Sequence, residues 1–587
     1  MAPKIYTSHR PDVPLVHTSV FTRLFASPVS DNVGAFPGTM AAFVDAATGT
    51  TLTRARVKDL SLALAHGLRT HPTTRPFSSR GDTILIYSPN SLAWPVVLYG
   101  CIAAGLRCSF ANSAYTAREL AYQYVDSGAK LLFTAQGGLK IVEAMFSELG
   151  IRKEEADKRL VVLGPDLRWA GGPGAAASPG ALGLLTMEGL LSQGALKEEE
   201  KFEGSQAHET VYLCYSSGTT GKPKAIETTH QNITTVVDIV GFDLPTLVPG
   251  VQPIIGILPF YHIYGLTQLV NLAFFRGWPV VIQSRFEPVE FCANIQRYKA
   301  VFAYVVPPVL VILARHPAVD AHDLSTLKYL VSAAAPLAPD LVHSVSQCRL
   351  NTKRHRANRS PFGITETSPC SHALNVLEAD KKVGSIGHLL PNLEARLVHA
   401  EDGKIDADDG QPGELWLRGK TVMKASGYLN NAEATRNAIT PDGWFKTGDI
   451  ATRDNEGYYY IIDRRKELIK YSGFQVPPAE LESVLLTHPD IADAAVIGVE
   501  SVERATELPR AYVVHAHPEK VVSAQARAKF ANGVAKWMET QVANHKFLRG
   551  GVSVINVVPK SAAGKILRRE LRVLAAQEAT PAEKAKL

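Results

Sequence analysis

The sequence is poor in the features that mark secreted, metal-clustered or membrane-spanning proteins. Six cysteines are spread over 587 residues, none in a Cys-x-x-Cys pair and none after residue 370. This spacing fits neither a disulfide framework nor a metal cluster, and it suits a reducing compartment. The longest apolar stretch, Val301–Ala314, is too short to span a bilayer. Met1–Pro14 carries charges and prolines but no apolar core, so we expect no secretory signal.

Neither positive nor negative residues are in large excess, with 62 Lys and Arg against 56 Asp and Glu. The formal net charge is +6 and the charges are diffuse, which gives no argument for a nucleic-acid partner. The densest basic run, Lys353–Arg356, lacks interleaved aromatic residues, so we expect a solvated loop there rather than an RNA site. With 46% apolar and 20% charged residues, the composition is that of a globular protein, and the length requires two or more domains.

Strand-like apolar runs alternate with helical patterns before about residue 165. Thr83–Tyr87 followed by Trp94–Cys101 is one such pair, and the alternation predicts α/β layers. Residues 170–185 form a Gly/Ala/Pro-rich loop, and Lys197–Glu203 is a charge run that we expect to be a solvated surface.

The most informative segment is the polar loop Tyr215–Lys224, which follows the apolar run Thr210–Tyr215. Its glycines let backbone N–H groups approach an anion, its hydroxyls add donors and its lysines add charge. Only two residues separate the two glycines, so this is not the P-loop of nucleotide hydrolases. A flexible surface loop is the simpler alternative, but a buried strand directly before the loop favours a phosphate cradle.

Further motifs follow this loop in a fixed order. They are Leu258–Gly265, Ser332–Leu337, Phe362–Thr367, Gly413–Gly419, Gly443–Asp449, Asp463–Val476 and Pro559–Ile566, with Ala111–Thr116 upstream. Together with the loop they resemble the adenylate-forming superfamily over roughly residues 40–572, closest to its coumarate–CoA ligase and luciferase branch. The resemblance implies an α/β fold with a large multi-sheet N-terminal adenylation domain (1–463), a hinge (464–466), a small mobile C-terminal α/β domain (467–575) and a tail (576–587).

The resemblance also assigns the ATP site. A carboxylate must attack the α-phosphate of ATP, and because two anions meet, positioning and positive charge carry the catalysis. The implied contacts to ATP or AMP are Ser216, Ser217, Gly218, Thr219, Thr220, Gly221, Lys224, Ala334, Phe362, Gly363, Thr365, Asp449 and Arg464. Glu366 is the implied Mg²⁺ ligand, and Asp449 and Arg464 are the implied ribose contacts.

Two half-reactions are expected to use different lysines. Lys565 would bridge the carboxylate and the α-phosphate during adenylation, whereas Lys470 and Gln475 would serve thioester formation after rotation about Lys466. Ser472 and Gly473 would line the path of the CoA thiol arm. The acyl group would lie against His262, Tyr264 and Ala333, where the extra methyl of Ala333 weakly disfavours a very long chain.

Three segments depart from the family pattern. Ala225 replaces a glycine, Ser360–Phe362 replaces a motif that ends in tyrosine, and Met423–Tyr428 carries two extra residues. Phe362 keeps a ring to stack on adenine but lacks the hydroxyl, while Pro361 removes a backbone donor. The long basic stretch before Phe362 also puts the affinity for adenine in question.

The sequence thus predicts an ATP-, Mg²⁺- and CoA-dependent ligase acting on an aromatic propenoic or medium-chain fatty acid. A luciferase-like oxygenase, a standalone enzyme that loads a carrier protein, and a catalytically inactive binding protein remain open alternatives. The tail Ala585–Leu587 resembles the Ser-Lys-Leu peroxisomal address, so we expect a peroxisomal import receptor as partner, or a cytoplasmic location if the tail is not read.

Overall fold

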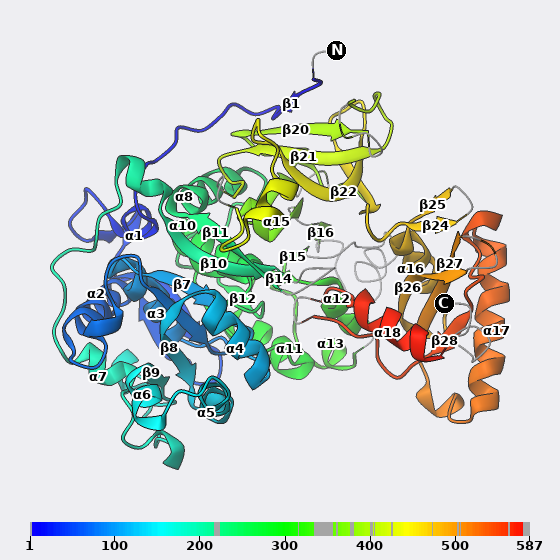
Figure 1. Cartoon of the computed structure of the whole chain (residues 1–587). Helices are drawn as coiled ribbons and strands as arrows, with labels where there is room; N and C mark the ends of the chain where they lie inside the picture. Colours follow the sequence, from blue (N-terminus) through cyan, green and yellow to red (C-terminus); the bar gives the residue numbers. More distant parts are fainter. Residues whose placement is uncertain are drawn as a thin grey trace.

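The structure is a computed structural model with several sheets, each packed against helices (Figure 1). It describes residues 3–216, 223–314, 316–333, 356–359, 362–375, 378, 381–399, 403, 405–423, 427–471, 474–501, 504, 506–561 and 564–578. For residues 179, 356–359 and 475 it describes the backbone alone.

A six-stranded sheet forms the first layer and carries the predicted phosphate-loop strand. Its order is β11 (Lys224–Thr229), β10 (Thr210–Ser216), β7 (Arg107–Phe110), β6 (Thr83–Tyr87), β8 (Ala129–Ala135) and β9 (Leu160–Leu163). All neighbours are parallel except β10 and β11, which are antiparallel. Both predicted strands are confirmed, at Thr83–Tyr87 and at Thr210–Ser216.

Helices cover both faces of this sheet, as a parallel sheet requires. They are α2 (Arg54–Thr70), α3 (Ala93–Ala103), α4 (Ala117–Asp126) and α5 (Leu139–Glu148). Successive residues of a strand point to opposite faces, so Ile84 and Ile86 join the large core that contains α2 and α3, whereas Leu85 joins a second core with α4 and α5. This is why β6 reads as an uninterrupted apolar run.

A seven-stranded sheet forms the next layer. Its order is β16 (Arg356–Arg359), β15 (Tyr329–Ser332), β14 (Phe302–Val305), β12 (Ile254–Gly256), β13 (Val280–Ile282), β4 (Ala41–Asp45) and β5 (Thr51–Thr53). Helices α8 (His230–Ile239), α11 (Pro288–Tyr298) and α12 (Pro307–Leu313) belong to the same part of the chain. The strands share one large core with α2 and α3.

An antiparallel five-stranded sheet follows, and the N-terminal segment joins its edge. Its order is β1 (Tyr6–Thr7), β20 (Leu393–Val398), β21 (Gly413–Gly419), β22 (Phe445–Arg453) and β23 (Tyr459–Arg464). Smaller elements lie between the sheets: the pair β17 (Phe362–Gly363) and β18 (Cys370–Ala373), the short 3₁₀ turn η8 (Thr365–Thr367) and α15 (Ala432–Ala438).

The C-terminal elements gather on one side of the molecule and have their own cores (Figure 1). They are β24 (Ile469–Tyr471), β25 (Phe474–Val476), α16 (Pro478–Leu485), β26 (Ile491–Ser501), β27 (Thr506–His515), α17 (Ala524–Gln541), β28 (Val552–Val554) and α18 (Arg568–Glu578). Alternation along β26 sends Val496 towards α16 and α17, and Ile497 towards α18. The predicted α/β class, with a large multi-sheet part and a smaller C-terminal part, is confirmed.

Two surface predictions need correction. Lys197, Glu198, Lys201 and Glu203 of the charge run are exposed as expected, but Phe202 is buried and Glu199 and Glu200 are half-buried. Glu200 pairs with Arg69 of α2 at 2.5 Å and with Arg80 at 3.0 Å, so this part of the run packs against the protein. Arg356 lies in the edge strand β16, not in a loop. No described helix is long and apolar enough to cross a membrane. The five cysteines among the described residues are buried free thiols.

Candidate active site

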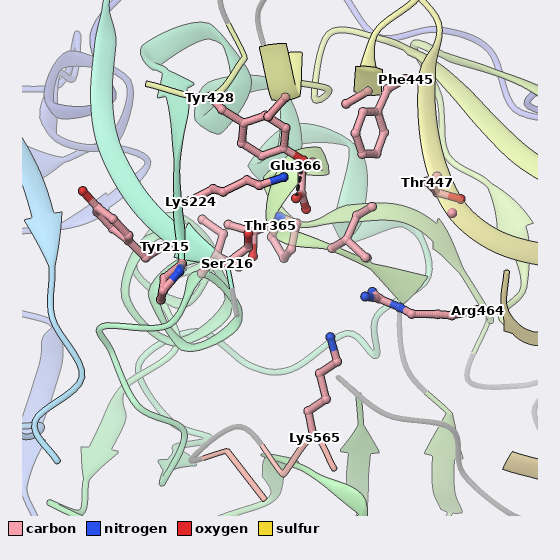
Figure 2. Close-up of a pocket in the computed structure, with 18 of the residues that line it drawn as sticks. Tyr215, Ser216, Lys224, Thr365, Glu366, Tyr428, Phe445, Thr447, Arg464 and Lys565 are labelled. Carbon is pink, nitrogen blue, oxygen red and sulfur yellow. Dashed lines mark hydrogen bonds between the residues drawn. The ribbon is translucent and has the colours of Figure 1, made fainter. Parts of the chain in front are cut away.

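A cavity of about 1400 Å³ lies where the sheets and the C-terminal elements meet. Its walls come from both parts of the chain, including Lys224 of β11, Glu366 of η8, Arg464 of β23 and Lys565 of the segment before α18. Figure 2 shows these four side chains directed towards a shared space. The cavity also contains the predicted residues Ser216, His262, Tyr264, Ala333, Gly363, Thr365, Lys466 and Lys470.

Strand pairing brings together the residues that flank the predicted phosphate loop. Ser216 at the end of β10 lies directly opposite Lys224 at the start of β11. Helix α4 contacts both ends: Tyr215 donates to Asp126 at 2.7 Å, and Tyr122 donates to the Pro223 carbonyl at 2.9 Å. Ser217, Gly218, Thr219, Thr220 and Gly221, which the sequence predicts as phosphate contacts, lie outside the described residues.

A carboxylate and an ammonium group face the cavity near this loop. The Tyr428 hydroxyl donates to Glu366 Oε1 at 3.0 Å, and Lys224 Nζ lies 4.9 Å from the centre of the Tyr428 ring (Figure 2). The backbone of Glu366 is fixed by the Met423 N–H at 2.7 Å. Among the described residues, no group of three or more metal-ligating side chains gathers in one place. A single carboxylate suits Mg²⁺, which is commonly held by one or two carboxylates together with substrate phosphates.

The predicted ribose contacts are neighbours across two antiparallel strands. Asp449 on β22 pairs in register with Arg464 on β23, and Arg464 Nε lies 3.2 Å from Asp449 Oδ1. Burial raises the pKa of Asp449, and the charge of Arg464 offsets part of that shift. Asp449 Oδ2 is buried and has no hydrogen-bond partner among the described residues. A buried acceptor without a partner is costly, so a ligand hydroxyl that reached this oxygen would satisfy it.

Lys565 enters the cavity from the C-terminal part of the chain. It ends a tight turn in which its carbonyl accepts from the Ser561 N–H at 2.8 Å and its N–H donates to Ser561 Oγ at 3.2 Å. Gly564, with φ of 77°, approaches Pro308 so closely that an added Cβ would lie 3.1 Å from that ring. Burial, and then the charge of Arg464, lowers the pKa of Lys565 to about 8. An ammonium group held in this way gains most from an anionic ligand.

The three predicted acyl residues, His262, Tyr264 and Ala333, also line the cavity. His262 Nδ1 accepts the Tyr264 N–H at 3.2 Å, and the Tyr264 hydroxyl donates to the Val331 carbonyl at 3.2 Å. Burial, and then the charge of Lys565, lowers the pKa of His262 to about 4, so its imidazole is neutral at pH 7. Ala333 is buried and also lines the cavity.

Lys470 lies at the exposed rim of the cavity rather than in its interior. It pairs with Gln475 across the β24–β25 hairpin, and its N–H donates to Glu507 at 2.7 Å. Ser472 and Gly473, the predicted CoA contacts, lie outside the described residues, as does Ala334. Two predicted nucleotide contacts do not line the cavity. Asp449 pairs with Arg464, which does line it, and Phe362 packs against the large core with its ring 6.0 Å from His372.

Comparison with known protein families decides what this arrangement is. The model of the AMP-binding enzyme family matches residues 29–429, and that of the AMP-binding enzyme C-terminal domain matches residues 480–565. This chain belongs to the AMP-binding enzyme family. The matched segments contain Lys224 and Glu366 in the first and Lys565 in the second, so the cavity is formed between the two family domains.

Curated relatives place the chain in the coumarate–CoA ligase-like branch. It is 32% identical to 4-coumarate–CoA ligase-like 4 of Oryza sativa subsp. japonica over 98% of this chain and 96% of the relative. It is likewise 32% identical to 4-coumarate–CoA ligase 1 of Petroselinum crispum, with 97% of each covered. The chain is therefore an AMP-forming acid–thiol ligase.

Solved structures agree on the fold. ATP-bound MatB from Rhodopseudomonas palustris superimposes with a TM-score of 0.76 at 24% identity, over 95% of this chain and 98% of that one. The o-succinylbenzoate–CoA synthetase MenE from Bacillus subtilis, in complex with ATP and magnesium ion, superimposes with a TM-score of 0.70 at 24% identity. The match covers 91% of this chain and 96% of that one.

Sequence reasoning missed several residues of this AMP-binding enzyme's cavity. Tyr428 closes the segment noted only for its two extra residues, and Glu414 belongs to a motif to which no role was assigned. Tyr115 belongs to the upstream Ala111–Thr116 motif, which was the available signal. Tyr261 and Cys370 also line the cavity, and their neighbours His262 and Glu366 were the nearest signals.

Proposed function

We propose that this AMP-binding enzyme activates an aromatic propenoic or medium-chain fatty acid as its acyl-adenylate and transfers the acyl group to CoA. The observation that supports this proposal is the shared cavity, where Lys565 of the C-terminal part faces Lys224, Glu366 and Arg464 of the large part. A 4-coumarate–CoA ligase is named for the same kind of acid. The hinge at 464–466 and the boundaries 1–463 and 467–575 are part of the proposal.

In the first step a carboxylate oxygen attacks the α-phosphorus of ATP, and pyrophosphate leaves. Two anions meet here, so the protein must supply positive charge where they approach. Lys565 holds the carboxylate against the α-phosphate, Lys224 binds the outer phosphates, and Asp449 with Arg464 orients the ribose. Glu366 would hold Mg²⁺, and the ion would supply further positive charge at the phosphates.

In the second step the CoA thiolate attacks the acyl carbon, and AMP leaves. Lys470 and Gln475 would serve this step after the C-terminal domain rotates about Lys466. Lys470 is exposed at the cavity rim, which leaves it free for a second arrangement. The relatives favour CoA over oxygen or a carrier protein as the acyl acceptor.

A panel of carboxylic acids tests the proposal. Pyrophosphate release with ATP and Mg²⁺ reports the first step, and AMP release that requires CoA reports the second. We expect both with at least one aromatic propenoic or medium-chain acid, and a thioester identified by mass spectrometry. Inactivity across the panel would contradict the proposed substrate class, and light emission with luciferin would favour the oxygenase.

We also propose that Ala585–Leu587 directs the protein to peroxisomes. These residues lie outside the described structure, and the proposal rests on the tripeptide alone. Deleting them from a fluorescently tagged protein should leave it in the cytosol. Continued import would refute the assignment.

A further inference from the structure

Tyr428 is held in the cavity wall by contacts of its own backbone. It forms a β-bridge with Ile226 of β11, and its N–H donates to Thr435 Oγ1 of α15 at 3.0 Å. The following residue, Leu429, donates to the Ala225 carbonyl at 2.9 Å. The side chain therefore enters the cavity from a fixed point beside β11, with 8% of the residue exposed.

This one side chain contacts two opposite charges through two different parts. Its hydroxyl donates to Glu366 Oε1 at 3.0 Å, and its ring face carries Lys224 Nζ at 4.9 Å from the centroid (Figure 2). A hydrogen bond to a carboxylate is among the stronger neutral-to-charged contacts, and an aromatic face attracts an ammonium group. Tyr428 therefore contacts both the Glu366 carboxylate and the Lys224 ammonium group without neutralising the charge of either.

The alternative contact is a direct ion pair between the two charges. Both groups line the same cavity, yet no ion pair within 4.0 Å joins Lys224 to Glu366 in the described part of the chain. Such a pair would satisfy both groups at the expense of any ligand, because a bound phosphate or cation would first have to separate them. Tyr428 stabilises the separated arrangement.

We propose that Tyr428 is a positioning residue that keeps Lys224 and Glu366 apart, so that Lys224 meets the phosphates of ATP and Glu366 meets Mg²⁺. This inference rests on the proposed function, because it assumes that ATP and Mg²⁺ enter this cavity. It predicts that the hydroxyl and the ring of Tyr428 have separable effects, one on the metal and one on the phosphates.

Two substitutions separate these effects. Tyr428→Phe keeps the ring under Lys224 but removes the donor to Glu366. We expect the Mg²⁺ concentration for half-maximal ATP binding, measured by calorimetry, to rise about tenfold. Tyr428→Leu removes both contacts and frees the two charges to pair. Binding of ATP in EDTA should then also weaken by about tenfold, whereas AMP, which lacks the outer phosphates, should bind as in the wild type.

A second substitution tests whether pairing between Lys224 and Glu366 causes the weaker ATP binding of Tyr428→Leu. In the Tyr428→Leu background, Glu366→Gln should restore ATP binding in EDTA, because a neutral amide cannot neutralise Lys224. Tyr460→Phe is the matched control, since its hydroxyl donates to a carboxylate, Asp454, at 3.2 Å outside the cavity. Thermal unfolding of each variant reports whether it folds, and the conservative Tyr428→Phe decides the question if the leucine variant does not.

Three results of these measurements would overturn the proposal. Wild-type Mg²⁺ dependence in Tyr428→Phe overturns the proposal, as does weak ATP binding in Tyr428→Leu that Glu366→Gln fails to restore. Equal losses of ATP and AMP binding would indicate a general structural role and also overturn it. If the wild-type protein itself binds no ATP with Mg²⁺, the proposed function fails, independently of Tyr428.

Discussion

The titration of Lys565 gives the sharpest test of the adenylation site. Its pKa is lowered to about 8 by burial and by Arg464. About 90% of the free enzyme therefore carries the charge at pH 7 and about 10% at pH 9. If the first step needs a cationic Lys565, kcat/KM for pyrophosphate release should fall about tenfold between pH 7 and pH 9. At its ordinary pKa of 10.5 the same lysine would give almost no change over this range.

Lys565→Arg is the matched variant, because a guanidinium stays charged throughout this range. Its kcat/KM should be lower than that of the wild type but should lack the alkaline fall. Pyrophosphate release under single-turnover conditions measures the first step alone, and thioester formation from synthetic acyl-adenylate measures the second. Lys565→Ala should nearly abolish the former and spare the latter. A flat wild-type profile to pH 9.5, or equal loss of both steps, would refute the reasoning.

The same shift predicts an opposite effect on stability. Because the folded-state pKa lies below the unfolded value of 10.5, the unfolded chain binds the proton more tightly. The free energy of unfolding should therefore rise as the pH increases from about 8 to about 10.5, by up to about 3 kcal/mol. Lys565→Met should bring a similar gain at pH 7, measured by denaturant unfolding. Equal stability of variant and wild type would mean that the ammonium group is well solvated.

Three further changes test other parts of the structure. Asp449→Asn should weaken ATP and AMP binding alike, by about tenfold in calorimetry, because both share the ribose; an effect on ATP alone would contradict the ribose role. Ala333→Val should raise KM for the acid several-fold and leave KM for ATP unchanged, whereas equal changes would place Ala333 outside the acyl space. Glu482→Gln should lower the free energy of unfolding by about 3 kcal/mol, because Arg568, 2.7 Å away and largely buried, would lose the negative charge of its nearest partner; unchanged thermal unfolding would show that the pair contributes little.

Local patterns in the sequence predicted the parts of the fold that depend on neighbouring residues. The strand Thr83–Tyr87 and the strand before the phosphate loop were predictable because a parallel strand buried on both faces is a continuous apolar run. The surface predictions were wrong where contacts with residues distant in the sequence bury a side chain. Glu200 pairs with Arg69 of α2 and with Arg80, and nothing within the charge run encodes those partners.

The candidate site also has features that the sequence predicts and features that only the folded structure decides. Motifs determine the residue types and their order, and from these the family, the predicted phosphate loop and the chemistry of adenylation follow. Only the tertiary structure decided that Lys565 shares a cavity with Glu366, because that depends on how the C-terminal part packs against the large part. It also decided the pKa of Lys565 and the separation of Lys224 from Glu366 by Tyr428, since burial and charge proximity are properties of the folded chain.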